Sequence, residues 1–409
     1  MSMVKQIPKD LSWDNRIQLM LEGYLFVQNR CNRLDTDVFQ TKLNGKNVIC
    51  MNGKEAAEIF FDEEKFEPLN NIPHLPNKNT NEKMTINSLD DQMCEQLCNE
   101  LLSSTRISEL NSLYFTRLEE QAKYWSNQEQ IIVFDEIKKL ITRVACHWAG
   151  IPIKDEELSE RANDLYALVD PFESAGLKQR DNKRIQNRVE SWIQEVFVQV
   201  WKEEIHPEPN ATITQISNFQ QNEKLLSVTL ATNLLIQILK MIVLNANIIT
   251  FEVLATIQHQ EYKRKLYDID QYDDWFIQEV RRYFPFEPFI GAKVRKEFTW
   301  EGYRFAEGSL VLLDMYGTNH DPRIWYNPDL FWPERFKDSE MLPYVRKNHN
   351  SYWKMLSEKV TRELMKTTLY FLTNHINFEV VDQDFDFSLR KIPTMLKTGL
   401  ILKNIKTVQ

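Results

Sequence analysis

Apolar and polar residues recur with two different periods along this chain. At residues 37–51, two short apolar runs flank Asn44-Gly45. Asn-Gly is the preferred two-residue turn of a β-hairpin, because both positions accept a positive φ. From Gly53 to Thr373 apolar residues mostly recur every three to four positions, most clearly at residues 134–149. That period predicts a mainly helical chain.

The pattern of strands returns twice in the second half of the chain. Two short strands are expected at residues 298–300 and 303–305, on either side of Glu301-Gly302. A further strand is expected at residues 309–314. Residues 377–403 alternate between apolar and polar side chains. We therefore expect one domain over residues 1–409, mainly α, with a small β region built from both ends of the chain. Its expected parts are residues 37–51, 298–314 and 377–403, with the helical bulk at residues 53–297 and 315–373.

Composition excludes several classes of function. The net charge of −9 argues against nucleic acid as the main partner, because binding phosphates needs a basic surface. Only 10 glycines occur and no Gly-rich phosphate loop is present, which argues against a nucleotide enzyme. The five cysteines are too scattered for a disulfide framework, so a cytoplasmic protein with reduced thiols is expected.

The longest apolar stretch, residues 234–257, predicts a buried helix. Polar residues are scattered along it, and these are costly inside a lipid bilayer. We therefore expect no membrane insertion. The interrupting residues are Gln237, Lys240, Asn245, Asn247 and Glu252.

Three motifs in the second half of the chain carry a resemblance to a known family. Glu279 and Arg282 form a Glu-x-x-Arg pattern, residues 319–323 read Asn-His-Asp-Pro-Arg, and residues 331–336 read Phe-Trp-Pro-Glu-Arg-Phe. In this order and spacing the chain resembles a cytochrome P450, more narrowly the bacterial fatty-acid peroxygenase and decarboxylase branch. The resemblance implies the cytochrome P450 fold and a structural charge triad of Glu279, Arg282 and Arg335.

The resemblance also implies a haem, yet its binding residues are not found where the family has them. The family holds haem iron with a cysteine thiolate in a glycine-rich loop. Residues 343–358 contain neither cysteine nor glycine, and Met355 occupies the expected ligand position. Where the family meets the haem propionates with a basic helix, this chain has Asp90-Asp91. No haem is therefore expected, and Met355 is interpreted either as a core side chain or as an unusual iron ligand.

Polar residues form a stripe on the apolar helix. Asn233, Gln237, Lys240 and Asn247 follow one another at spacings of four, three and seven, which places them on one face. The resemblance aligns Lys240 with an arginine that binds the substrate carboxylate. The stripe is either a set of satisfied core residues or a substrate site, with Lys240 and Asn247 as catalytic candidates and Asn233 and Gln237 as substrate-binding candidates.

Three functions follow from these observations. The first is a haem-free, cofactor-independent enzyme acting on a small, carboxylate-bearing metabolite in specialised-metabolite biosynthesis. The second is a non-catalytic relative that binds a ligand or a protein partner. The third is a haem-dependent fatty-acid peroxygenase with an unusual axial ligand. Cys94 and Cys98 are four apart, but no matching pair of ligands occurs elsewhere, so no metal site is expected.

Overall fold

The computed structural model describes residues 5–69, 97, 99–169, 179–221, 224–337 and 352–408. Their contacts divide the chain into two compact units. Unit 1 comprises Met1–Leu75, Arg264–Lys354 and Asp386–Leu396, and unit 2 comprises Pro76–Lys263, Met355–Phe385 and Lys397–Gln409. The expected single domain over residues 1–409 stays a prediction.

Unit 1 contains a five-stranded sheet with the order β1-β2-β10-β7-β3. The predicted hairpin is confirmed, because β1 and β2 pair antiparallel around Asn44 and Gly45, whose φ angles are 52° and 73°. β10 lies parallel to β2 and antiparallel to β7. The strands are β1 (Val38–Leu43), β2 (Lys46–Met51), β3 (Phe66–Pro68), β7 (Phe289–Val294) and β10 (Leu310–Asp314).

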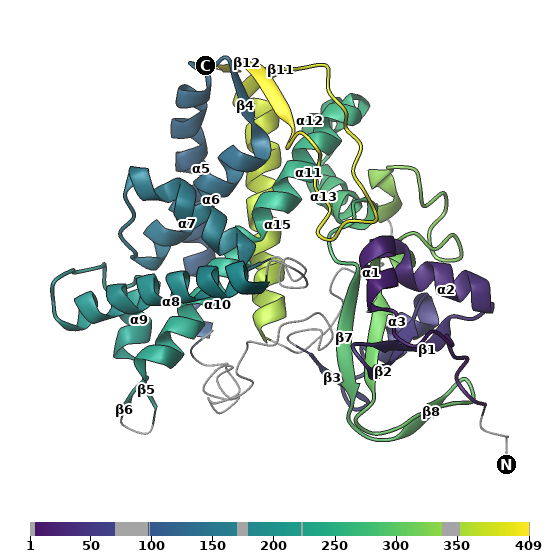
Figure 1. Ribbon diagram of the computed structural model, residues 1–409. Helices are drawn as coiled ribbons and strands as arrows, with labels where there is room; N and C mark the ends of the chain where they lie inside the picture. The colour runs from purple at the N-terminus through teal and green to yellow at the C-terminus, as the bar shows by residue number, and fades with distance from the viewer. Residues whose placement is uncertain are drawn as a thin grey trace. The chain divides into compact units, whose positions relative to one another are not determined.

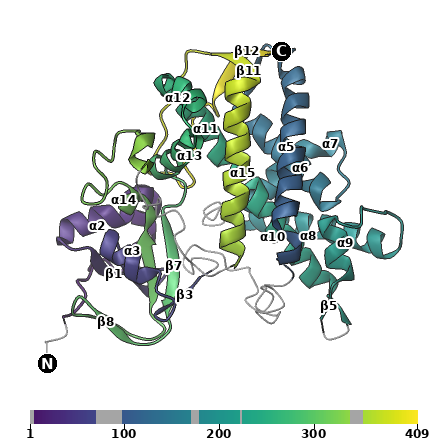
Figure 2. The same ribbon diagram turned by 180° about the vertical axis from the view of Figure 1, so that it is seen from behind.

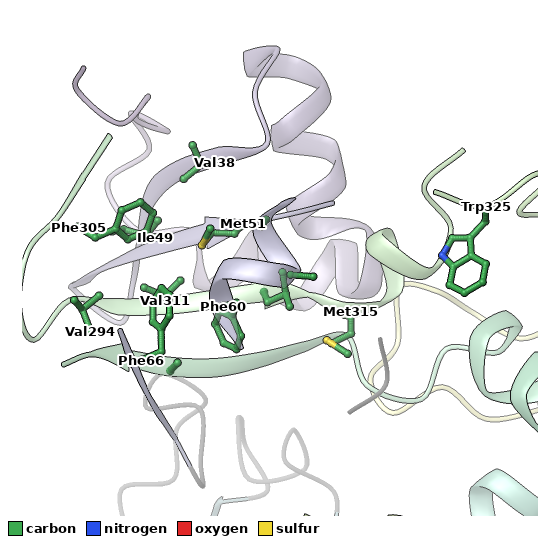
Figure 3. Packing of buried hydrophobic residues seen from close by; sticks show 14 of the residues in the cluster. Val38, Ile49, Met51, Phe60, Phe66, Val294, Phe305, Val311, Met315 and Trp325 are labelled. Carbon is green, nitrogen blue, oxygen red and sulfur yellow. The ribbon is translucent and has the colours of Figure 1, made fainter. Parts of the chain in front are cut away.

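The sheet of unit 1 is packed with large apolar side chains, as Figure 3 shows for its central cluster. The predicted hairpin of β8 (Phe298–Trp300) and β9 (Tyr303–Phe305) adds Phe305, which stacks on Phe298 at 4.9 Å between ring centroids. The helices of unit 1 are α1 (Arg16–Glu22), η1 (Gly23–Leu25), α2 (Phe26–Leu34), α3 (Lys54–Phe60), α12 (Lys263–Asp268), α13 (Tyr272–Tyr283), α14 (Met315–Asn319) and η4 (Pro333–Phe336).

Unit 2 is a helical assembly built around α6 (Figures 1 and 2). α6 packs against α5, α7, α10 and α11, and α10 also packs against α8 and α9. One side of α6 is buried along its whole length, as its 3.6-residue period predicted. The helices are α5 (Ser104–Trp125), α6 (Val133–Ala149), α7 (Asp155–Ala167), α8 (Gln179–Trp201), α9 (Thr212–Asn218), α10 (Val228–Val243), α11 (Asn245–Gln258), η3 (Gln260–Tyr262) and α15 (Tyr352–Asn374).

The strands of the expected β region are divided between separate sheets. The C-terminal strands β11 (Ile376–Val380) and β12 (Ile401–Thr407) form a separate three-stranded sheet with β4 (Gln130–Ile132) in unit 2. Between β11 and β12 only an isolated bridge joins Phe387 to Leu396. An alternating pattern identifies a strand but not the strand with which it pairs.

Strands also occur inside the expected helical bulk at residues 53–297. β7 is buried on both faces at several positions, so its sequence lacks the alternation that marks a half-exposed strand. β3 and β4 span three residues each. β5 (Gln220–Gln221) and β6 (Lys224–Leu225), which pair with each other, span two residues each. Such short segments give no periodic signal.

The predicted buried helix is present as α10 and α11. Together they form one helical stretch, Val228–Gln258, that is apolar and long enough to cross a membrane. However, 78% of its most apolar window is buried inside the protein, as in the core helix of a folded domain. Leu244 separates α10 from α11 but keeps a helical backbone (φ −50°, ψ −32°). Side chains on the two helices can therefore share one face.

Candidate functional site

The three residues of the expected charge triad lie together in unit 1. Glu279 and Arg282, both on α13, form a fully buried bidentate pair with two nitrogen–oxygen distances of 2.8 Å. Arg335, from η4, brings its Nε to 3.0 Å from the Glu279 carboxylate, and its side chain is 5% exposed. Buried charges are tolerated only when they are paired in this way.

The triad also fixes neighbouring backbone. Arg282 donates to the carbonyl oxygen of Asn319 at 2.9 Å, and the backbone N–H of Trp332 donates to Glu279 at 2.8 Å. Arg335 donates to the carbonyl oxygens of Tyr326 and Leu330. The hydrogen bonds described for the network all go to atoms of unit 1, and they hold the loop before η4 against α13.

Lys240 is the only basic residue of α10, and it lies in the last turn. Its side chain is half-buried and, among the described residues, has no hydrogen-bond or ion-pair partner. Burial lowers the pKa of the Lys240 ammonium, with no acidic neighbour to raise it again. An anion beside this ammonium would offset the cost of its burial.

An accessible line of side chains runs along α10 and α11 in unit 2. It comprises Asn233, Gln237, Lys240, Leu244 and Ile248, all of which are partly or fully exposed. Their spacings of four, three, four and four place them on one helix face. Most other side chains of these two helices are buried. The line is polar on the N-terminal side of Lys240 and apolar on its C-terminal side.

Asn247 does not belong to the accessible line. It is 6% exposed and interacts with other residues of the protein. Its neighbour Asn245 is fully buried and donates to the carbonyl oxygens of Met241 and Ile242 at 3.1 and 3.0 Å. The structure therefore brings three of the four stripe residues together on an accessible face, and the predicted catalytic role of Asn247 stays a prediction.

Glu252 is a buried acid on α11 to which the sequence analysis assigned no role. Its side chain is fully buried, and neither carboxyl oxygen has a hydrogen-bond partner in the described part of the chain. Burial alone raises the pKa of Glu252 well above its ordinary value of 4.5. Burial therefore favours the neutral, protonated form of Glu252. The signal in the sequence was a lone carboxylate inside an apolar helical run.

A buried pair of hydroxyl groups lies near Glu252. The hydroxyl groups of Tyr114 on α5 and Thr368 on α15 are 2.8 Å apart, and both residues are buried. Burial raises the pKa of Tyr114, and the nearby Glu252 carboxyl raises it further. Three helices of unit 2 thus contribute polar groups to one otherwise apolar region.

The described cysteines do not suit a haem-thiolate centre. Cys31, Cys50 and Cys146 are free and buried. Burial raises the pKa of the Cys146 thiol to about 12 and those of the other two thiols as well, so all three stay protonated at neutral pH. Cys94 and Cys98 lie outside the described residues, and no cysteine follows Cys146 in the sequence.

Several predicted features fall where the structure does not describe the chain. Asp90-Asp91 and the segment 338–351, with His349, lie outside the described residues. Met355 is part of α15, but its side chain also lies outside the described part. Within the described residues, no group of three or more His, Cys, Asp or Glu side chains could hold a metal ion.

Comparisons with known proteins agree on the fold. The "Cytochrome P450" family matches residues 252–354, which include Glu279, Arg282 and Arg335. Rhazimal synthase of Alstonia scholaris is 39% identical over 66 residues, which cover 16% of this chain and 13% of that protein. Cytochrome P450 4A11 of Homo sapiens is 38% identical over 66 residues, with the same two coverages of 16% and 13%. The match thus spans only about an eighth of the length of these curated relatives.

Solved structures match over nearly the whole chain. A variant of cytochrome P450 OleT in complex with arachidonic acid has a TM-score of 0.90 and 25% identity, and covers 99% of both chains. Cytochrome P450EX alpha with myristic acid has a TM-score of 0.89 and 28% identity, and covers 99% of this chain and 100% of the other. The expected fold is confirmed: this chain has the cytochrome P450 fold, and its similarity along nearly the whole length to cytochromes P450 OleT and P450EX alpha supports the resemblance to the fatty-acid peroxygenase branch.

Proposed function

We propose that this protein binds a carboxylate-bearing amphiphile along the accessible line of α10 and α11, and that it does so without haem chemistry. Lys240 carries the proposal, because it is a half-buried ammonium with no partner among the described residues. A carboxylate beside Lys240 would restore the interaction that burial removes. Leu244 and Ile248, on the C-terminal side, would contact the apolar part of the ligand.

The ligand class is supported by the related structures. Cytochrome P450 OleT and cytochrome P450EX alpha were solved with arachidonic acid and myristic acid, and both ligands are long-chain carboxylic acids. Lysine provides a positive charge but not the planar, bidentate grip of arginine. We therefore propose a small-molecule ligand with one carboxylate, in a protein that works in the cytoplasm.

The site also suits acid–base chemistry that needs no cofactor. As the alternative to anchoring a carboxylate, an unprotonated Lys240 would act as a general base, and its lowered pKa makes this form available at a lower pH than for an ordinary lysine. Asn233 and Gln237 would orient polar groups of the ligand next to it. We infer that the protein catalyses a non-redox reaction of a small metabolite. Lys240 is the residue that we propose as its acid–base group.

A haem-dependent peroxygenase is the second candidate. It is supported by the 99% coverage and the TM-score of 0.90 against cytochrome P450 OleT. Against it stands the donor set, because the described thiols are buried with raised pKa values and residues 147–409 contain no cysteine. We derive no step through haem for this chain.

A binding experiment tests the role of Lys240. Isothermal titration with myristic acid compares the wild-type chain with Lys240→Met, which keeps a long, unbranched side chain but removes its charge. A charge-assisted hydrogen bond contributes about 2 kcal/mol, so Lys240→Met should weaken binding roughly thirtyfold. Lys240→Arg should retain most of the affinity. The control is Lys123→Met, which removes an exposed ammonium on α5.

The same titration has a pH dependence with a defined sign. Only the protonated form of Lys240 attracts a carboxylate, so affinity should be full below its pKa and fall as the pH rises through it. Because that pKa is lowered, the loss should begin at a lower pH than the ordinary lysine value of 10.5 predicts. Equal affinities of the wild-type protein and Lys240→Met for myristic acid would refute the proposed site.

A further inference from the structure

The N-terminal part of unit 1 exposes an unusual number of large apolar side chains. Leu11 and Trp13 are 90% and 89% exposed, and Ile17, Met20 and Leu21 on α1 are also exposed. Ile17, Met20 and Leu21 are three and four residues apart, so they occupy one face of the helix. We call these five residues the apolar patch. Scattered apolar side chains are normal on protein surfaces, but these five fall within residues 11–21, and exposed apolar side chains gathered in one region mark an interaction site.

Positive charges lie next to the apolar patch. Arg16 belongs to α1 itself, and Lys9 precedes the patch in the chain. Lys42 and Lys46 flank the tip of the β1–β2 hairpin, which is fastened to the start of α1 because the N–H of Asn15 donates to the carbonyl oxygen of Lys42 at 2.8 Å. All four basic side chains are exposed, and no acidic partner is found for them among the described residues.

The acidic residues in the same segment are already engaged. Asp10 and Glu22 form ion pairs with Arg30 at 2.8 and 2.9 Å. Asp14 accepts from the N–H groups of Gly45 and Arg16, each at 2.9 Å. Backbone donors leave the charge of Asp14 in place, so the four basic side chains around the apolar patch stand against this one carboxylate, and the local balance is positive although the whole chain carries a net charge of −9.

We propose that the apolar patch and its basic rim dock this protein on the surface of an anionic lipid bilayer. A short amphipathic helix with large apolar residues on one face and Lys or Arg beside it lies in the plane of the headgroups. Tryptophan favours this interfacial zone, and Trp13, the aromatic residue of the patch, is 89% exposed. Anionic headgroups would attract Lys9, Arg16, Lys42 and Lys46.

This docking differs from insertion of a membrane-spanning helix. α1 has only 7 residues, far too few to span a bilayer, so the contact is peripheral and reversible. A second copy of the chain is a less suitable occupant, because it would bring its own four basic side chains against the same surface. The proposal is independent of Lys240, which belongs to unit 2.

Cosedimentation with vesicles tests the proposal on the full-length protein. The wild-type protein should bind vesicles of phosphatidylglycerol and phosphatidylcholine, and bind pure phosphatidylcholine at least about tenfold more weakly. The triple variant Trp13→Ser, Ile17→Ser, Leu21→Ser should lose binding by about tenfold or more. A matched control, Tyr326→Ser with Leu330→Ser, removes two exposed apolar side chains elsewhere in unit 1 and should bind as the wild type does.

The basic rim is tested separately. The variant Lys9→Gln, Lys42→Gln, Lys46→Gln should bind anionic vesicles about tenfold or more weakly, and 0.5 M salt should weaken the wild-type protein in the same way. Circular dichroism spectra equal to wild type would exclude misfolding of either triple variant. Unchanged vesicle binding by the apolar variant, equal binding to both kinds of vesicle, or a wild-type dimer that the apolar variant abolishes would each overturn the proposal.

Discussion

The buried carboxyl of Glu252 makes a quantitative prediction about stability and pH. Glu252→Gln replaces a neutral acid with a neutral amide of nearly the same shape, so packing on α11 should change little. In the wild-type protein the native state keeps the Glu252 proton to a higher pH than the unfolded state does, because burial raises the pKa of this carboxyl. In the unfolded state the same group loses its proton above its ordinary pKa of 4.5. Unfolding therefore releases a proton, and it becomes more favourable as the pH rises.

The size of the effect follows from proton linkage. Each pH unit between the two pKa values lowers the free energy of unfolding of the wild-type protein by about 1.4 kcal/mol relative to a protein without this group. Glu252→Gln removes that term. The difference in unfolding free energy between Glu252→Gln and wild type should thus increase with pH from about pH 5 upward, at about 1.4 kcal/mol per unit. The increase should stop at the native pKa of Glu252.

Urea unfolding at pH 5, 6 and 7, followed by circular dichroism, measures this difference. The control is Glu129→Gln, which makes the same change of side chain at an exposed position. If the unfolding free energies of wild type and Glu252→Gln change in parallel over this pH range, Glu252 is not a buried neutral acid. The reasoning would also fail if the variant became relatively less stable at higher pH.

Three further predictions concern other parts of the molecule. Glu279→Ala should destabilise unit 1 by roughly 3–5 kcal/mol in urea unfolding, because it leaves Arg282 buried without its partner; a loss below 1 kcal/mol would contradict this role. Gly23→Ala should destabilise by roughly 1–3 kcal/mol, because Gly23 has a φ of 59° and an added Cβ would lie 2.4 Å from the carbonyl oxygen of Leu389; a thermal melt equal to wild type would contradict it. Lys240→Met should weaken the binding of myristic acid roughly thirtyfold in isothermal titration, whereas Lys123→Met should not.

Local structure was largely predictable where a pattern is long or a turn is distinctive. Asn44-Gly45 and Glu301-Gly302 each predicted a hairpin, and both hairpins are present. The 3.6-residue period predicted α6. β7 was missed because several of its side chains are buried on either face, which removes the alternation. Pairing between distant strands, such as β12 with β4, depends on how the whole chain folds and leaves no local signal.

The candidate site was predicted only in part, for a physical reason. Helical spacing places Asn233, Gln237 and Lys240 on one face but does not say which face is accessible. The structure extends the accessible line through Leu244 and Ile248 and leaves Asn247 buried. Glu252 was visible as a polar residue in an apolar run, but its lack of a hydrogen-bond partner depends on the neighbouring helices.

The proposed function depends most directly on our proposal that this chain forms no haem-thiolate centre. The decisive measurement is the absorbance spectrum and iron content of the full-length protein, purified from cells supplied with a haem precursor, with cytochrome P450 OleT prepared in parallel as a positive control. We predict no Soret band and less than about one tenth of an iron atom per chain, because the described cysteine thiols are buried and protonated. A Soret band with one iron atom per chain would contradict the account.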